Sequence, residues 1–358
     1  LRSPATPTEI HYREDRRYVP KLEPLSAQPI ESRGPSAIRA GAVYLIIGGL
    51  GGIGEQLALH LARRGARLAL LGRGPAESAQ PFLQKLQQSG AEAIYLCADA
   101  SKRGQLADAV RISRRRFGTL TGVFHLAGVV SRESFSWSAK SAAGVREVLA
   151  AKVDVAVNLA EILRHGPSVE FVALFSSLSA IAAAAGTGLA DYAAANAFLD
   201  GFARSRDGER GTRWVSLAWS TWAGAGMGAR SGGAMALSRL GLEPIAVQQG
   251  LTAMERILHE SREVHLVIIQ GPPRSDGRTH HDALLEAPPA PLAPPAATPA
   301  QPAATAARAP QKGRRSTAER FLVEQVAELL GAQVNEIDPE VSLAEYGADS
   351  LLLADILT

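Results

Sequence analysis

The chain has 358 residues, 46% of them hydrophobic, and a formal net charge of +3 at pH 7. This length and composition allow a large buried core and more than one domain, and the nearly balanced charge gives no reason to expect a nucleic-acid or membrane partner. The single cysteine, Cys97, excludes an internal disulfide and a cysteine-based metal cluster. It fits a reducing compartment, so we expect a cytoplasmic protein without a metal site.

Residues 1–40 contain proline, arginine and glutamate in quantity and show little periodicity. We interpret most of this region as a connector. Residues 9–19 are predicted to form a short hairpin, in which the following apolar side chains pack: Ile10, Tyr12, Tyr18 and Val19.

From residue 41 to residue 272, short apolar strands alternate with helices. The expected strands are residues 43–47, 67–71, 93–97, 122–125, 170–175 and 213–219, and the expected helices are residues 57–63, 82–89, 106–117, 145–164 and 192–206. This alternation predicts an α/β fold, a Rossmann-like doubly wound parallel sheet with helices on both faces. Ligands bind such sheets outside the carboxyl ends of the strands. Cys97 lies in one of the apolar strands, so we expect it to be buried.

Residues 273–315 are dominated by proline and alanine, a composition that predicts a semi-extended linker. Residues 316–319 then form a capping-box pattern that opens an apolar-faced helix. After Arg320 the chain has acidic residues and no lysine or arginine. Residues 316–358 are therefore predicted to be a small, acidic, all-α module, of which the chain contains the first part.

A glycine-rich stretch, Gly48-Gly-Leu-Gly-Gly-Ile-Gly54, joins the first strand of the sheet to the first helix. A strand–turn–helix unit of this kind brings backbone N–H groups and a helix N-terminus close to a phosphate. The stretch therefore predicts a dinucleotide site, although a single glycine motif also fits a plain tight turn. The candidate residues are Gly48, Gly49, Leu50, Gly51, Gly52, Ile53 and Gly54.

The ends of the next strands indicate which nucleotide binds. Arg73 follows the second strand, where its guanidinium suits a 2′-phosphate and favours NADPH over NADH; the alternative is a surface arginine. Asp99, followed by Ala100, closes the third strand and is a candidate for the adenine, or else caps its own loop. His125, Ala127 and Gly128 close the fourth strand, where the small residues let backbone approach the cofactor. A lone histidine in this position is more often a core residue than a catalyst.

A second group of residues fits ketone reduction, which needs a hydride donor and an acid for the developing alkoxide. Tyr192 and Asn196 are four residues apart and share a helix face. The phenol of Tyr192 is a suitable acid, and the ammonium of Lys152 on the preceding long helix is expected to lower its pKa. Ser177 ends a buried strand and is expected to bind the carbonyl oxygen; spacing alone leaves Ser179 as the alternative. Asn196 is expected to orient Lys152, directly or through water.

These motifs together resemble one family. They are GGLGGIG at 48–54, VFHLAG at 123–128, AKVD at 151–154, FSS at 175–177, YAAANAFLD at 192–200 and AWSTW at 218–222. The stretch 42–271 resembles the ketoreductase domain of a modular type I polyketide synthase, in the short-chain dehydrogenase/reductase superfamily. Polyketide and fatty-acid ketoreductases are similar to this chain in placing Asn four residues after Tyr. Residues 1–40 resemble the tail of the structural subdomain that precedes such a domain.

The resemblance implies NADPH-dependent, stereoselective reduction of a β-ketoacyl thioester to a β-hydroxyacyl thioester. It also implies that Tyr192, Ser177, Lys152 and Asn196 are catalytic, and that residues 224–251 form a lid, with Met227 near its start. The stretch 129–134 contains neither stereochemical signature of the family, so the hydroxyl configuration stays open. Two alternatives remain: a silent ketoreductase-like scaffold that docks carrier proteins, and a free-standing reductase of small ketones.

A shorter resemblance lies near the end of the chain. Residues 346–351, YGADSL, are similar to the acyl carrier protein motif whose serine accepts phosphopantetheine. Ser350 is then the attachment site at the start of a helix, where the helix N-terminus favours a phosphate; the alternative is a plain N-cap. The implied partners are an acyl carrier protein bearing a β-ketoacyl thioester and other modules of a synthase.

Overall fold

The structure is a computed structural model that describes residues 10–25, 36–131, 140–186, 188–229, 237–238, 240–272 and 284. The carrier-like module expected at residues 316–358, with Ser350, lies outside the described residues. The expected linker at residues 273–315 also lies outside them, apart from Leu284.

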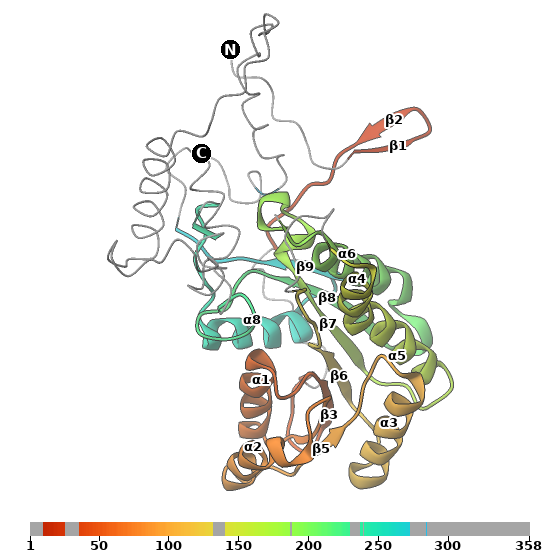
Figure 1. The fold of residues 1–358 in the computed structure, drawn as a ribbon, viewed down its shortest axis with the longest axis vertical. Coiled ribbons are helices and arrows are strands. Elements are labelled where there is room, and N and C mark those ends of the chain that lie inside the picture. Colours follow the sequence, from red (N-terminus) through yellow and green to blue (C-terminus); the bar gives the residue numbers. More distant parts are fainter. Residues whose placement is uncertain are drawn as a thin grey trace, which may run out of the picture. The chain divides into compact units, whose positions relative to one another are not determined.

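A seven-stranded parallel sheet forms the centre of the described chain, in the order β5-β4-β3-β6-β7-β8-β9 (Figure 1). Its strands are β3 (Val43–Ile47), β4 (Arg67–Gly72), β5 (Ala93–Cys97), β6 (Gly122–His125), β7 (Phe171–Ser177), β8 (Arg213–Trp219) and β9 (His265–Ile268). Strand order reverses between β3 and β6, because β3 pairs with β4 on one side and with β6 on the other. The predicted Rossmann-like, doubly wound fold is confirmed.

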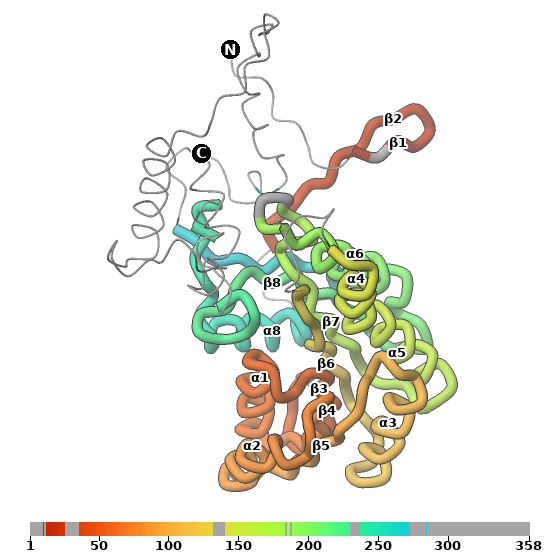
Figure 2. The backbone as a smooth tube through the Cα atoms, in the orientation of Figure 1, coloured from red at the N-terminus to blue at the C-terminus, as the bar shows by residue number. Residues whose placement is uncertain are grey.

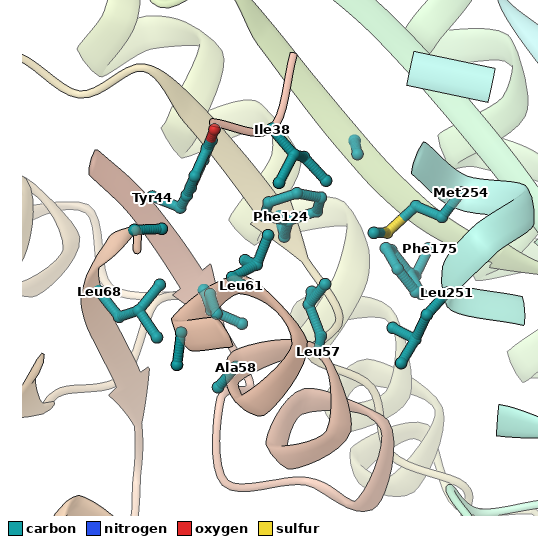
Figure 3. Close-up of a cluster of buried hydrophobic side chains, with 14 of the residues drawn as sticks. Ile38, Tyr44, Leu57, Ala58, Leu61, Leu68, Phe124, Phe175, Leu251 and Met254 are labelled. Atoms are coloured by element: carbon teal, nitrogen blue, oxygen red, sulfur yellow. The ribbon is translucent and has the colours of Figure 1, made fainter. Parts of the chain in front are cut away.

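Helices cover both faces of this sheet. Successive side chains of each strand point to opposite faces, and both sets are apolar. The helices are α1 (Gly52–Arg63), α2 (Ala76–Gln88), α3 (Arg103–Phe117), α4 (Ala142–Leu149), α5 (Val155–Arg164), α6 (Ala190–Arg206) and α8 (Val247–Glu260). On β3, Tyr44 and Ile46 join the core under α1, α2 and α8 (Figure 3). Leu45 and Ile47 point the other way, into the core under α3, α5 and α6. Each face thus holds a separate apolar cluster, and β3 contributes side chains to both.

The long helix expected at residues 145–164 is interrupted. Between α4 and α5 the structure has a π-helical turn, η2 (Ala150–Asp154), with Lys152 at its middle. A π-turn accommodates one extra residue and is frequent at functional sites. Periodicity predicted the helix but not this turn, which changes the direction in which Lys152 points.

Two expectations about packing are wrong. Cys97 is exposed rather than buried, because it is the last residue of β5, which lies at the edge of the sheet and pairs with β4 alone among the described strands. The predicted hairpin exists, with β1 (His11–Arg13) paired antiparallel to β2 (Arg16–Tyr18). Its apolar side chains do not pack, however, and Tyr12 is 73% exposed. A two-stranded hairpin provides too little surface to bury its own side chains.

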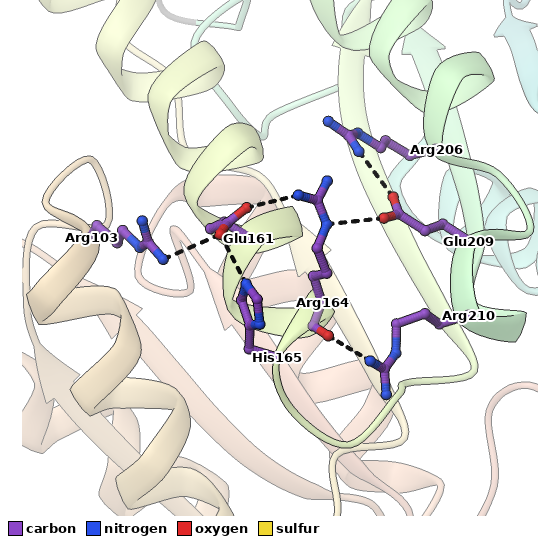
Figure 4. A network of polar contacts seen from close by, with 7 residues as sticks. All are labelled: Arg103, Glu161, Arg164, His165, Arg206, Glu209 and Arg210. Atoms are coloured by element: carbon purple, nitrogen blue, oxygen red, sulfur yellow. Dashed lines mark hydrogen bonds and ion pairs between the residues drawn. The ribbon is translucent and has the colours of Figure 1, made fainter.

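A polar network joins α3, α5 and α6 near the short 3-10 segment η5 (Glu209–Gly211) (Figure 4). Glu161 of α5 contacts Arg103, Arg164 and His165, and Glu209 contacts Arg164 and Arg206. These side chains are partly exposed, so each ion pair contributes about 0–1 kcal/mol. The network holds neighbouring helices together without taking part in the site below.

The tube in Figure 2 follows the same path. Strands β3 and β6 pair in parallel up to Ile47 and His125, so their carboxyl ends are neighbours. Among the described helices, none combines the length and the apolar character needed to cross a membrane. Within the same residues there is also no group of three or more histidine, cysteine or acidic side chains able to hold a metal ion.

Candidate active site

The glycine turn lies at the reversal of strand order, between the carboxyl ends of β3 and β6. Gly48 has a φ of +89°, which glycine adopts without strain, and its N–H donates to Leu71 O at 2.8 Å. A Cβ at Gly48 would lie 2.9 Å from Ala127 N, and one at Gly54 would overlap the Gly48 carbonyl oxygen. Both positions therefore require glycine for close backbone approach.

The N-terminus of α1 directly follows the glycine turn at the same edge. Its N-cap residue, Gly51, has no side chain to accept from the first N–H groups of the helix. Those N–H groups, on Gly52, Ile53 and Gly54, together with the helix dipole, make a site that favours an anion. A Cβ at Gly52 would lie 2.7 Å from Gly226 N, so the segment after β8 approaches the glycine turn closely. This arrangement fits a dinucleotide pyrophosphate.

A cavity of about 480 Å³ continues from the glycine turn along the ends of β4, β5 and β6. The predicted cofactor residues that line it are Gly48, Arg73, Asp99, Ala100, Ala127 and Gly128. Its size lies in the range of small-molecule sites. A glycine cradle, a helix N-terminus and an arginine at the end of the second sheet strand together fit the phosphates of NADPH.

The opposite wall of this cavity comes from α4 and η2 and was missed in the sequence analysis. It consists of Ala143, Arg146, Glu147, Ala150, Ala151 and Asp154. These positions are three or four residues apart, so they share one helix face. That spacing was readable in the sequence, but nothing there indicated that this face would meet the cofactor strands.

Asp99 and His125 have structural partners. Asp99 Oδ1 accepts from the N–H and the hydroxyl of Ser101 at 3.0 and 2.7 Å, as the loop-capping alternative predicts, while Asp99 also lines the cavity. His125 is fully buried and does not line the cavity. Its Nε2 lies 3.2 Å from Lys152 O, and burial lowers its pKa to about 3, helped by the charge of Lys152. A neutral His125 that donates to Lys152 O therefore supports the η2 turn.

The candidate catalytic residues meet at the end of β7. Ser177 is the last residue of that strand, and Tyr192 lies in the first turn of α6. The Ser177 side chain interacts with the Tyr192 phenol and favours its ionised form. Ser179 is buried, and its hydroxyl donates to Ser177 Oγ at 3.0 Å. The hydroxyl that interacts with the Tyr192 phenol is thus that of Ser177. Ser179 positions this hydroxyl by donating a hydrogen bond to it.

Lys152 approaches from η2. Its side chain is 2% exposed, and Nζ lies 5.5 Å from the centroid of the Tyr192 ring. Nζ donates to Phe175 O at 2.8 Å. Burial lowers the pKa of Lys152 to about 8, opposed by the charge of Asp200. A Cβ at Gly128 would lie 3.0 Å from Lys152 Cε, so glycine makes room for this side chain.

The electrostatics of Tyr192 differ from the expectation. Burial raises the pKa of the phenol above its usual value, and hydrogen bonds with Asn196 and Ser177 oppose that rise. Lys152 was expected to lower this pKa, yet its ammonium is paired with the Phe175 carbonyl and burial dominates. Tyr192 is therefore protonated at neutral pH, as an acid must be before it donates.

Asn196 is fully buried on the same helix face as Tyr192. Its Nδ2 donates to Tyr192 O at 2.7 Å, whereas the hydrogen-bond partner of Lys152 Nζ is Phe175 O. Its Oδ1 is buried and has no hydrogen-bond partner within the described residues. Within the described residues, the expected direct link from Asn196 to Lys152 is therefore not formed, and the link through water stays a prediction.

Comparison with known proteins places this geometry in a family. The family model of the KR domain matches residues 42–224, more than half of the chain. The chain belongs to this ketoreductase (KR) domain family. The ketoreductase domain is an oxidoreductase of the short-chain dehydrogenase/reductase type. The model of the phosphopantetheine attachment site matches residues 320–358, so the start of a carrier domain follows in the sequence.

Similar proteins support this membership. Polyketide synthase PksM of Bacillus subtilis strain 168 is 29% identical over 357 residues, which are 98% of this chain and 8% of PksM. PksN of the same strain is 30% identical over 355 residues, which are 97% of this chain and 6% of PksN. The chain thus spans less than a tenth of the length of these curated relatives.

Solved ketoreductases share the fold. One is PlmKR1, from the first module of phoslactomycin biosynthesis in Streptomyces sp. HK803, with a TM-score of 0.60 and 29% identity over 74% of this chain and 60% of that one. Another is a ketoreductase domain from the bacillaene assembly line, with a TM-score of 0.61 and 28% identity over 73% of this chain and 62% of that one.

Proposed function

We propose that this ketoreductase domain reduces a β-ketoacyl thioester, delivered on an acyl carrier protein, to the β-hydroxyacyl thioester. The observation that carries the proposal is the meeting of Tyr192, Ser177 and Lys152 beside a cavity that begins at the glycine turn. When bound, NADPH supplies a hydride, which with one proton completes the reduction of the ketone.

The chain's own residues then handle the oxygen and its proton. Ser177 donates a hydrogen bond to the substrate carbonyl oxygen and positions it beside the phenol. Tyr192 transfers its proton to that oxygen as negative charge develops there. The Lys152 ammonium, 5.5 Å from the ring centroid, stabilises the phenolate that remains and is the source of its replacement proton. Asn196 holds the first turn of α6 through Tyr192 O.

We also propose the partners, location and boundaries. A carrier protein presents the substrate, other modules of a synthase precede and follow this step, and the protein works in the cytoplasm. Residues 1–40 form a connector with the tail of a structural subdomain, 41–272 the catalytic domain, 273–315 the linker and 316–358 the first part of the carrier. Ser350 lies in the stretch that matches the phosphopantetheine attachment site and is proposed to bear that group.

The direct test is incubation of the chain with NADPH and a β-ketoacyl N-acetylcysteamine thioester. We expect the NADPH absorbance to fall in step with formation of the β-hydroxy product, whose configuration chiral chromatography then assigns. Binding of NADPH without turnover, for carrier-tethered as well as free substrate, would contradict the proposal and favour a silent scaffold.

The buried Lys152 predicts a pH dependence. Its pKa of about 8 means that the ammonium loses its proton as pH rises through that value. Since the phenolate needs that charge, we expect kcat/KM to fall above about pH 8, as the free enzyme titrates. Lys152→Arg keeps a charge at all these pH values, so the alkaline fall should disappear even where the maximum rate is lower. A wild-type profile that stays flat to pH 10 would contradict the role of Lys152.

A further inference from the structure

The cofactor cavity has a set of three charges at its mouth that the mechanism does not use. Arg73, in the loop after β4, pairs with Glu147 of α4 at 3.6 Å, and Arg146 lies next to Glu147. All three residues line the cavity. The Arg73 and Glu147 side chains are 57% and 62% exposed, so either can exchange partners with a ligand.

Two of the three charges pair with each other, and the third has no ion pair among the described residues. Glu147 neutralises part of the charge of Arg73, the one arginine that the sequence assigned to the 2′-phosphate. Arg146 has no ion pair with any residue in the described ranges. It belongs to the same face of α4 as Ala143, which also lines the cavity. The cavity is therefore lined by one arginine that already has an ion pair, Arg73, and by a second, Arg146, that has none among the residues the structure describes.

A phosphate monoester carries a charge of about −1.5 to −2 at neutral pH. Bound to Arg73, it displaces the carboxylate of Glu147 and then has that like charge as a neighbour, which disfavours binding. Arg146 offsets this effect, because it adds a second guanidinium on the same wall. Neither the repulsion by Glu147 nor the attraction by Arg146 acts on a nucleotide that lacks the 2′-phosphate.

We propose that α4 sets the selectivity of the cavity for a 2′-phosphate, with Arg146 as a second phosphate-binding cation and Glu147 as a competitor for Arg73. The inference rests on the proposed NADPH site. Removing the Glu147 charge should strengthen binding of a 2′-phosphorylated nucleotide, and removing the Arg146 charge should weaken it. Each effect should be roughly 1.5- to fivefold, as for partly exposed charge pairs, and should shrink at high salt.

The test is calorimetric titration of the full chain with 2′,5′-ADP, which has the 2′-phosphate but no nicotinamide, and with 5′-AMP, which lacks that phosphate. The variants are Glu147→Gln, Arg146→Gln and Arg73→Gln. Glu92→Gln and Arg116→Gln are matched controls, because Glu92 and Arg116 form a similar exposed pair at 3.7 Å and neither lines the cavity. Thermal unfolding of each variant checks that the fold is intact.

We expect the Kd for 2′,5′-ADP to fall in Glu147→Gln, to rise in Arg146→Gln and to stay unchanged in both controls, with 5′-AMP unaffected throughout. If Arg73→Gln weakens binding while both α4 variants behave like the controls, the inference is wrong and the cofactor site stands. If Glu147→Gln weakens binding, Glu147 positions Arg73 and does not compete for it. If the wild type fails to prefer 2′,5′-ADP over 5′-AMP, the inference and the NADPH site fall together.

Discussion

Tyr192→Phe is expected to lower turnover of a β-ketoacyl thioester by about 10²–10⁴-fold, the usual contribution of a general acid. The substitution removes one oxygen atom and leaves the ring that lies near Lys152 Nζ. The proton donor to the alkoxide is lost, and so is the interaction of the phenol with Ser177. NADPH binding should be unchanged, because Tyr192 does not line the cofactor cavity. Steady-state assays and fluorescence titration with NADPH measure the two effects separately.

Tyr44→Phe is the matched control. The Tyr44 hydroxyl also makes a hydrogen bond, donating to Ala37 O at 2.7 Å, but it lies in the core under α1 and α2. Its loss should cost about 1 kcal/mol of unfolding free energy and leave kcat unchanged. A Tyr192→Phe enzyme that turns over as fast as Tyr44→Phe would show that Tyr192 is not the proton donor.

Much of the fold follows from local patterns that the sequence shows directly. Strand β3 is buried at every position, because both of its faces meet helices, and an unbroken apolar run is the signature of such a strand. Parallel strands bring all their carboxyl ends to one edge. Ser177 ends β7, so the parallel arrangement alone places it at the edge that holds the glycine turn.

What escaped prediction depends on contacts between distant parts of the chain. The π-turn at Lys152 leaves the apolar spacing of the helix nearly intact, so periodicity does not reveal it. The exposure of Cys97 follows from the position of β5 at the sheet edge, which strand composition does not encode. The pKa of Tyr192 is set by how deeply the phenol is buried. Sequence alone gives the residue and its neighbours along the helix, but not that depth.

One such contact, the ion pair between Lys140 and Asp191, supports the catalytic helix. Lys140 Nζ lies 3.0 Å from Asp191, and the two side chains are 1% and 0% exposed. Asp191 Oδ1 also accepts from the backbone N–H of Tyr192 at 2.9 Å. The pair thus fixes the first turn of α6 to the segment that precedes α4. The acid of the proposed mechanism is the residue directly after Asp191.

Lys140→Met is expected to lower the free energy of unfolding by about 3–5 kcal/mol, because it leaves the Asp191 carboxylate buried without its counter-charge. Turnover should fall as well, since the turn that holds Tyr192 loses an anchor. The double variant Lys140→Met/Asp191→Asn removes both charges, and its amide oxygen can still accept from the Tyr192 N–H, so it should recover most of that stability. Urea unfolding of the single and double variants measures this coupling.

The exposed pair of Arg111 and Asp108 on α3 is the control for this experiment. Its side chains are 49% and 64% exposed, so Asp108→Asn should change the unfolding free energy by less than about 1 kcal/mol. A buried pair differs because each charge offsets the desolvation penalty of the other. The loss of unfolding free energy caused by one substitution therefore depends on whether the other charge is present. If the effects of Lys140→Met and Asp191→Asn simply add in the double variant, the two charges are independent and the anchor of Tyr192 lies elsewhere.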